Sequence, residues 1–134
     1  MTPITLVVPV VPVPKARPRT VTTKQGKRRT YTPETTVEAE DTIGRYWNQA
    51  YPHRAPWPRE TALEVGVSVY LPKPKGIKRL WPTVRPDGDN YGKLALDSLN
   101  GLAWEDDAQV VRMVVEKRYD ASPRWEIRIC EFQG

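Results

Sequence analysis

Two short acidic segments place the strongest constraint on how this chain can fold. The first is DGDNYGK at residues 87–93, and the second is EDDAQ at residues 105–109. Their aspartates repel one another when they are brought close together, unless a cation holds them. Hard carboxylate oxygens of this kind suit Mg²⁺ or Mn²⁺. We therefore expect the fold to gather both segments at one divalent-cation site.

The first acidic segment lies where an extended, proline-containing approach gives way to a helix. Residues i and i+2 of an extended segment project to the same side, so Asp87 and Asp89 are expected to face one small volume. Asp89 or Asn90 is expected to cap the helix. Lys93 then lies one turn beyond Asp89 on the same helical face.

Other interpretations of this segment account for fewer of its residues. An aspartate pair at a helix start often only caps the helix and matches its dipole, and this alternative stays open. An EF-hand loop beginning at Asp87 would place Tyr91 fifth and Ser98, rather than a bidentate Glu, twelfth. A P-loop ending at Lys93 would lack its earlier glycine and would carry Leu94 where Ser or Thr is required.

Composition excludes several classes of protein. The chain has 134 residues with one Cys and one His, and we expect a single domain over residues 1–134. No apolar run is long enough for a membrane span, and the proline-broken N-terminus lacks the positive leader of a signal peptide. The lone Cys130 fits a reducing cytoplasm. The lone His53 argues against structural zinc and nucleophilic triads.

Basic residues are concentrated in two segments ahead of the acidic ones, at about residues 15–32 and 72–86. The net charge is +5, yet no Asp or Glu occurs before Glu34 or between Glu64 and Asp87. One such run is usually a solvated loop, but two runs around an acidic centre suit phosphodiester cleavage of a polyanion. The residues expected to contact DNA are Lys15, Arg17, Arg19, Lys24, Lys27, Arg28, Arg29, Lys73, Lys75, Lys78, Arg79 and Arg85.

The hydrophobic pattern predicts an α+β fold, with a mixed sheet and two main helices on one side. Expected strands cover residues 4–11, 63–71, 109–119 and 125–132, and Pro9 should push the first to a sheet edge or a bulge. A basic hairpin is expected at residues 20–32, and helices at residues 34–50 and 90–99. The predicted apolar stripe of the first helix comprises Ala39, Ile43, Tyr46, Trp47 and Ala50. Trp104 is expected to anchor the acidic turn in the core.

The paired acidic motifs resemble the RusA family of Holliday junction resolvases, also called crossover junction endodeoxyribonucleases. Residues 87–93 are similar to the family's D-x-D-N-x-x-K, and residues 104–110 are similar to its W-x-D-D-x-Q-V. The spacing between the motifs also agrees, and the segment at residues 12–19 is similar to the phage and prophage branch. Tyr91 departs from the aliphatic residue that is common there. The resemblance covers most of the chain.

This resemblance implies a homodimeric, Mg²⁺-dependent nuclease, with Mn²⁺ as the alternative ion. It implies binding of four-way DNA junctions and paired symmetric nicks in recombination and repair, in the cytoplasm of a bacterial host and from a phage or prophage gene. No membrane and no small-molecule cofactor is implied. The family's essential acids fall on Asp87, Asp89 and Asp107, its essential lysine falls on Lys93, and Asp106 is a further candidate metal ligand.

The residues themselves support the same chemistry. A metal held by Asp87, Asp89 and Asp107 would lower the pKa of a bound water and polarise the scissile phosphate. Lys93 would stabilise the phosphorane or neutralise excess carboxylate charge. The alternative is a surface ion pair with Asp89 or with Asp97, and we take Asp97 as structural. Two other functions stay open: a non-catalytic DNA-binding module, and a Mg²⁺-dependent nuclease of other branched DNA. A mere binder gains nothing from acids clustered beside its anionic ligand.

Overall fold

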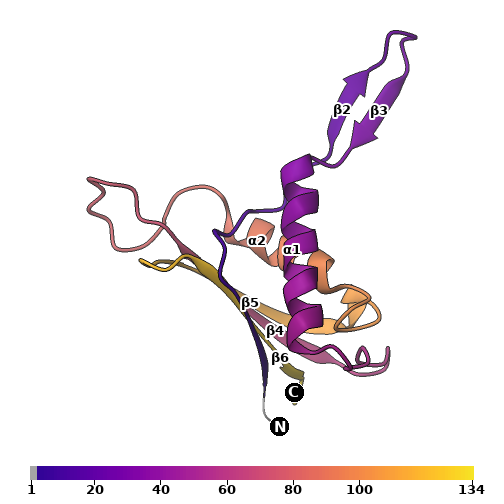
Figure 1. Ribbon diagram of the computed structural model, residues 1–134, viewed down its shortest axis with the longest axis vertical. Helices are drawn as coiled ribbons and strands as arrows, with labels where there is room; N and C mark the ends of the chain where they lie inside the picture. The colour runs from indigo at the N-terminus through magenta and orange to yellow at the C-terminus, as the bar shows by residue number, and fades with distance from the viewer. Residues whose placement is uncertain (1–2) are drawn as a thin grey trace.

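A four-stranded mixed sheet carries both main helices on one face, and a two-stranded hairpin projects away from it (Figure 1). This computed structural model describes residues 3–134, apart from the side chain of Arg19. The predicted α+β class, with its mixed sheet and its helices on one side, is confirmed. No helix among residues 3–134 is long and apolar enough to cross a membrane.

The order of the strands places both acidic segments in one crossover connection. The strands are β1 (Ile4–Val8), β4 (Leu63–Leu71), β5 (Val110–Tyr119) and β6 (Arg124–Glu131), and their order across the sheet is β1-β6-β4-β5. All neighbours are antiparallel except β4 and β5, which run parallel. Parallel neighbours cannot be joined by a tight turn. The chain from residue 72 to residue 109 therefore crosses the face of the sheet, and it carries both motifs with it.

The core lies between the sheet and the helices. Alternate residues of β4 are buried, as the sequence pattern predicted, and they face buried residues of β6 across the ladder. The facing pairs are Val65 with Ile129, Val67 with Ile127 and Val69 with Trp125. Strand β1 ends at Val8 instead of reaching residue 11, because Pro9 has no N–H for the ladder, and it lies at the predicted sheet edge.

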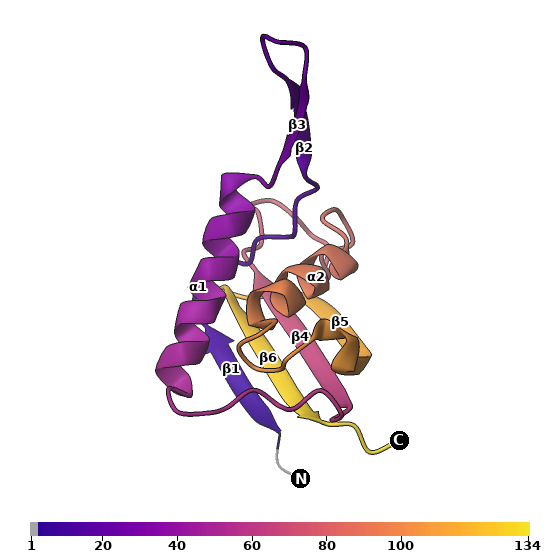
Figure 2. The ribbon, with the colours of Figure 1, turned by 90° about the vertical axis from the view of Figure 1, so that its right-hand side faces the viewer.

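Helix α1 (Glu34–Ala50) has the predicted bounds, and α2 (Gly88–Leu99) begins two residues earlier than predicted. Ile43 and Trp47 of the predicted α1 stripe are buried, whereas Ala50 in the last turn is exposed. The two helices lie side by side over the sheet (Figure 2). The buried side chains of α2 are those of Tyr91, Leu94, Ala95, Ser98 and Leu99.

The predicted basic hairpin is formed by β2 (Arg19–Thr22) and β3 (Arg28–Tyr31). Gly26 adopts a φ of 77° in its turn, a conformation that glycine tolerates at no steric cost. All the described side chains of β3 are exposed. The hairpin extends from the N-terminal end of α1, far from the C-terminus of the chain (Figure 2).

Candidate active site

The first two acids lie at the start of α2, but not in one extended segment. Asp87 is the N-cap residue with extended backbone angles, and the helix already begins at Gly88, so Asp89 lies in its first turn. The prediction that both acids project from one extended strand is therefore wrong, as is the capping role given to Asp89 or Asn90. The helix starts early because the Asn90 N–H donates to the carbonyl oxygen of Asp87 at 3.2 Å.

The carboxylate of Asp87 is not used to cap the helix. No side-chain capping hydrogen bond is formed at the start of α2. Asp87 and Asp89 are exposed, and neither side chain makes a hydrogen bond or an ion pair with any residue in the described part of the chain. Both carboxylates are therefore open to an external cation. The alternative that this pair only caps the helix loses its main support.

Gly92 allows the acidic helix to approach β5 closely. A Cβ atom at this position would lie 2.8 Å from Cγ2 of Val115 and 3.0 Å from Cε of Met113, closer than side chains pack. The glycine of the DGDNYGK segment therefore serves helix packing. Lys93, the next residue, is exposed. Within residues 3–134 it forms no ion pair, so the pairing considered with Asp89 or Asp97 is not found.

The second acidic segment is a short turn with its own internal bonds. Asp106 caps the one-turn 3₁₀ helix Asp107–Gln109 by accepting from the N–H of Ala108 at 3.1 Å. Its other oxygen lies 3.6 Å from Nη1 of Arg59. Asp106 thus stabilises the turn with both carboxylate oxygens. Its place as a further metal ligand stays a prediction.

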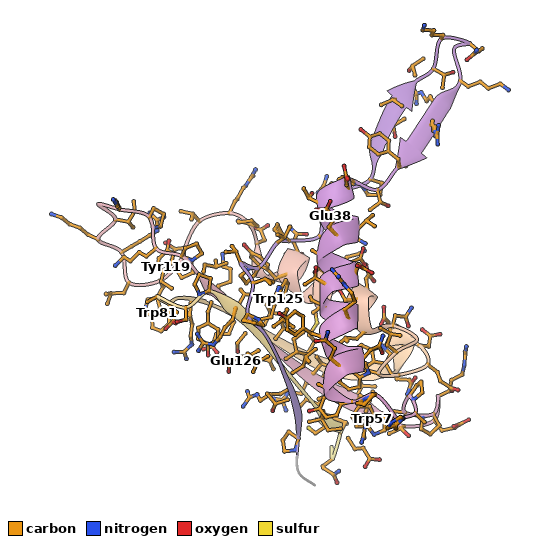
Figure 3. All side chains as sticks on the ribbon, viewed as in Figure 1. Glu38, Trp57, Trp81, Tyr119, Trp125 and Glu126 are labelled. Atoms are coloured by element: carbon orange, nitrogen blue, oxygen red, sulfur yellow. The ribbon has the colours of Figure 1, made fainter. Side chains whose placement is uncertain are left out.

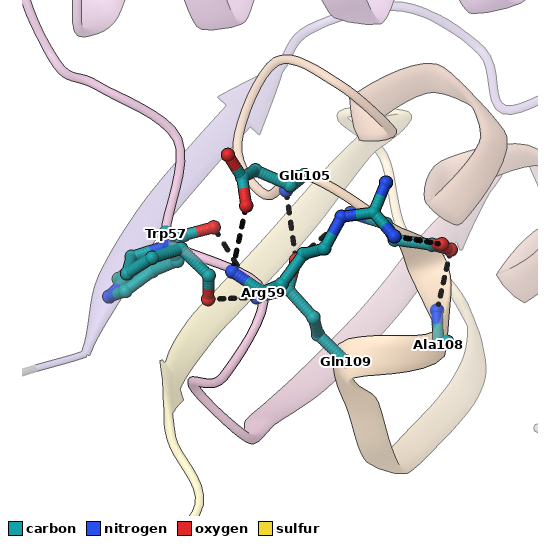
Figure 4. A network of polar contacts seen from close by, with 7 residues as sticks. Trp57, Arg59, Glu105, Ala108 and Gln109 are labelled. Carbon is teal, nitrogen blue, oxygen red and sulfur yellow. Dashed lines mark hydrogen bonds and ion pairs between the residues drawn. The ribbon is translucent and has the colours of Figure 1, made fainter.

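Gln109 connects the acidic turn to the segment that follows α1 (Figure 4). Its buried side-chain oxygen accepts from the backbone N–H groups of Glu105 and Asp106, both at 2.9 Å. Its amide nitrogen donates to three backbone carbonyl oxygens of the connection, those of Trp57 at 3.3 Å, Pro58 at 2.8 Å and Thr61 at 3.1 Å. One amide therefore fixes the turn that presents Asp107.

Asp107 is held by the core. The indole Nε1 of the fully buried Trp104 donates to Oδ1 of Asp107 at 2.7 Å, which confirms that Trp104 anchors the acidic turn. Partial burial raises the pKa of Asp107 above its ordinary value. The Trp104 bond opposes that rise, while the nearby carboxylates of Asp97 and Asp106 add to it. Asp107 is thus a carboxylate whose charge the folded chain alone disfavours.

Lys15 balances part of this negative charge. Its Nζ lies 3.1 Å from Asp97 and 3.2 Å from Glu40, and its backbone N–H donates to the carbonyl oxygen of Asn90 at 2.9 Å. Burial alone would lower the pKa of Lys15, but bonds to the two carboxylates and their charges raise it. Lys15 therefore joins the N-terminal segment to both helices. Its predicted contact with DNA stays a prediction.

The candidate ligands lie in two groups along α2, so the described residues do not bring both acidic segments together at one site, as the sequence led us to expect. Asp107 lies beside Asp97 near the C-terminal end of the helix, whereas Asp87 and Asp89 lie at its start. The eight residues from Asp89 to Asp97 span roughly 12 Å of helix. In residues 3–134 no cluster of three or more His, Cys, Asp or Glu side chains could hold a metal ion. Mg²⁺ binds through one or two carboxylates, waters and substrate phosphates, so the open carboxylates of Asp87 and Asp89 fit this ion.

The loop at residues 72–86 is clamped by three consecutive residues of β5. Lys117 binds the end of the loop, Arg118 packs on its middle, and Tyr119 binds an earlier part. The contacts are Lys117 Nζ to the carbonyl oxygens of Val84 and Pro86 (2.9 Å each), Arg118 Cζ to the Trp81 ring (5.4 Å) and Arg79 Nε to the Tyr119 hydroxyl (2.9 Å). The end of this loop fixes the position of Asp87.

The basic residues of the hairpin are exposed and are not neutralised by the rest of the chain. Lys24, Lys27, Arg28 and Arg29 take part in none of the ion pairs formed within the described residues. Arg17 is exposed as well, while the side chain of Arg19 lies outside the described residues. In the second basic segment, Lys73 and Arg79 contact Tyr119, and Lys75, Lys78 and Arg85 are exposed.

Three residues of the site have structural roles that the sequence did not assign. Gln109 appeared only as a letter of the second motif, although its position three residues after Asp106 is the spacing of a capping box. Lys15 and Lys117 act over separations of more than thirty residues, to Asp97 and to the 72–86 loop. Nothing local in the sequence indicates those partners.

Comparison with known proteins gives two matches. A family model described as "Endodeoxyribonuclease RusA" matches residues 9–130. The protein YqaN of Bacillus subtilis (strain 168), described as uncharacterized, is 40% identical over 81 residues. That alignment covers 52% of this chain and 57% of YqaN, so it spans a little over half of that protein's length.

Replacing Gln109 should destabilise the whole acidic turn. Gln109→Leu leaves the N–H of Asp106 and the carbonyl oxygen of Thr61 without their partner, at about 1–3 kcal/mol for each group that water cannot reach. We expect urea denaturation to give a free energy of unfolding lower by roughly 3 kcal/mol. Gln109→Glu keeps the oxygen that accepts from Glu105 and Asp106, but its second carboxylate oxygen faces three carbonyl oxygens. The free energy of unfolding should therefore fall by a similar amount at neutral pH. Gln49→Leu, at an exposed position of α1, is the control. Wild-type stability of Gln109→Leu would contradict the role described.

The raised pKa of Asp107 predicts a pH-dependent gain in stability for Asp107→Asn. A carboxyl whose pKa is raised by folding stabilises the fold below its unfolded pKa of about 3.9, and that contribution is lost as the pH rises through the folded value. In metal-free protein, Asp107→Asn should therefore raise Tm at pH 7, with a smaller gain near pH 4. Asp41→Asn, which breaks only a surface pair, should show no gain. Equal gains for Asp107→Asn at both pH values would refute the prediction.

Proposed function

We propose that this chain, which belongs to the RusA family of endodeoxyribonucleases, resolves four-way DNA junctions by paired symmetric nicks in recombination and repair. The observation that carries the proposal is the crossover from β4 to β5, which presents Asp87, Asp89 and Asp107 between two basic segments. Asp87 and Asp89 form neither a capping bond nor an ion pair within the described residues, and acids placed where DNA would approach are favourable only if a cation neutralises them. This argues for a nuclease over a non-catalytic DNA-binding module.

The donor set supports Mg²⁺ as the cofactor, with Mn²⁺ as the alternative. Asp87 and Asp89 at the start of α2 would hold the metal through their open carboxylates. Asp107 lies beside Asp97, about 12 Å of helix away, and would complete the ligand set when metal and DNA draw the two groups together. When bound, the metal supplies Lewis-acid activation of water and charge stabilisation at the scissile phosphate. A scissile phosphate and water would complete the coordination that the two groups of acids leave open. Asp106, whose oxygens already bond Ala108 and Arg59, is the weaker candidate ligand.

The chain's own residues contribute orientation and charge. Trp104 directs one oxygen of Asp107, and the Gln109 amide fixes the turn that carries it. Lys93 is one helical turn beyond Asp89, and its exposed ammonium group is free to approach a phosphate. A cation in that place stabilises negative charge that grows on the phosphate oxygens during displacement. Lys93 is therefore proposed as the catalytic lysine.

The two basic segments are proposed to hold the DNA on either side of the acids. The hairpin reaches outward from α1, and the 72–86 loop extends from the end of the sheet where α2 begins (Figure 1). Exposed and unpaired cations release counterions from DNA when they bind phosphates, which supplies affinity without sequence preference. Selectivity for junctions over duplex DNA must therefore come from the shape of the substrate.

Two symmetric nicks in one junction require two active sites related by a two-fold axis. One chain of this size carries one set of acids, so we propose a homodimer with an isologous interface. We further propose that residues 1–134 act as a single nuclease domain. The single cysteine fits a reducing bacterial cytoplasm, and the phage-like segment at residues 12–19 is consistent with a phage or prophage gene.

The proposed reaction predicts that Asp89→Asn separates binding from cleavage. The change removes a ligand charge from the metal site and also one repulsive charge beside DNA. Cleavage of a synthetic four-way junction with Mg²⁺ should be abolished, while binding in EDTA should be unchanged or tighter. Asp41→Asn is the matched control and should cleave normally. Equal cleavage of junction, flap and fork substrates by wild type would indicate a nuclease of other branched DNA. Loss of binding together with activity, in a folded variant, would count against a metal role.

The basic hairpin predicts a change in the salt dependence of binding. Glutamine at Arg17, Arg19, Lys27, Arg28 and Arg29 together should weaken junction and duplex binding alike. The slope of log K against log salt concentration should flatten by roughly 0.9 for each phosphate that the protein no longer neutralises. Arg45→Gln on α1, which removes only a surface pair with Asp41, is the control. An unchanged slope would show that the basic segment at residues 15–32 points away from DNA.

A further inference from the structure

A large aromatic side chain is exposed on the loop that leads into the acidic helix. Trp81 is 53% exposed, whereas Trp47, Trp104 and Trp125 are at most 2% exposed. Figure 3 shows Trp81 and Tyr119 at the end of the sheet from which the loop extends. An indole in such a place gains free energy from any partner that removes its apolar surface from water.

The Trp81 ring is oriented by the rest of the chain. The guanidinium carbon of Arg118 lies 5.4 Å from the ring centroid, within cation–π distance. Arg118 is held in turn by Glu116, whose Oε1 lies 2.7 Å from its Nη2. The hydrogen bonds of Lys117 and Tyr119 fix the loop on both sides of Trp81. The indole is therefore exposed without being loose, as a recognition surface requires.

A hollow of about 580 Å³ lies beside this ring and reaches the first acid of the proposed site. Trp81, Val84 and Val115 give it apolar walls, and Arg85, Lys117 and Asp87 give it charged edges. Arg118 does not line the hollow, so it contacts the indole from outside. The hollow thus joins an aromatic surface to Asp87.

The chemistry of the hollow suits a nucleobase better than a phosphate. Asp87 repels an anion, and the ammonium of Lys117 already donates to two backbone carbonyls. A base offers a flat apolar face for the indole and polar edges for the charged groups, and every base has such a face. The positive charge of Arg85 and of the rest of the loop complements the phosphates on either side of that base.

We propose that Trp81 is a stacking platform for an unpaired base of the strand held at Asp87, and that this stack helps to select branched DNA. The inference rests on the proposed function and identifies a residue that makes it selective for branched DNA. In a linear duplex each base is already stacked between neighbours, and extruding one costs a few kcal/mol. At a branch point bases are more readily unstacked, so the platform favours the junction.

Binding measurements in EDTA test this proposal without cleavage. The probes are a synthetic four-way junction and a linear duplex that contains one of its arm sequences. Trp81→Ala should weaken junction binding by roughly 5- to 150-fold, the range for removal of one base–aromatic stack, and should change duplex binding little. Trp81→Phe should keep most of the affinity. Leu80→Ala is the matched control, since Leu80 is 77% exposed on the same loop but does not line the hollow.

Tryptophan emission supplies a second readout that keeps Trp81 in place. In a Trp57→Phe background the other three tryptophans are buried, so quenching by DNA reports on Trp81. The junction and a short oligothymidine strand should quench this emission, and the duplex should not. The inference fails if neither of them quenches it, or if Trp81→Ala keeps the wild-type preference for the junction. Equal wild-type affinity for junction and duplex would instead refute the proposed function. Quenching by oligothymidine would then still show whether Trp81 stacks on a base.

Discussion

The parallel pairing of β4 with β5 is the constraint on which the rest of this molecule depends. Because parallel neighbours require a crossover, the chain must leave the end of β4, pass over the sheet and return to the start of β5. That crossover contains the 72–86 loop, α2 and the acidic turn. All the candidate catalytic residues lie in it, and the core beneath it is the β4–β6 ladder. The buried β4–β6 ladder therefore supports the part of the chain that carries all the candidate catalytic residues.

Some acids of the site are bonded by cations or N–H groups of the chain and others are not, and this difference separates structural acids from candidate metal ligands. Asp97, Asp106 and Glu40 are engaged by Lys15, Arg59 or backbone N–H groups, so they contribute to the fold. Asp87 and Asp89 make no such bonds within residues 3–134. Asp107 is intermediate, because Trp104 holds it while burial and Asp97 raise its pKa. A carboxyl whose pKa is raised by burial and by neighbouring charge is a candidate for a functional site, and among the three candidate acids Asp107 has that property.

The sequence predicted much of this architecture, because the signals involved are local. Alternation in residues 63–71 and the apolar stripe of residues 34–50 depend only on near neighbours, and both elements were found where expected. The start of α2 was placed too late because Asp89 or Asn90 was taken as the N-cap residue, whereas Asp87 takes that place. Gly92 within the helix packs against Val115, a residue distant in the sequence. The partners of Lys15 and Lys117, and the Trp57–Thr61 carbonyls that Gln109 binds, escaped prediction for the same reason, since these bonds join segments brought together only by the fold.

The two basic segments differ in rigidity, and this difference fits two kinds of DNA contact. The β2–β3 hairpin projects into solvent with its described basic side chains unpaired, so it suits long-range attraction to phosphates, which tolerates many geometries. The 72–86 loop is clamped by three successive residues of β5, and a fixed geometry is what discrimination between DNA shapes requires. Attraction and discrimination can then be altered independently. A nuclease that must ignore most duplex DNA yet act on its branches benefits from this separation, because stronger attraction alone would favour both substrates equally.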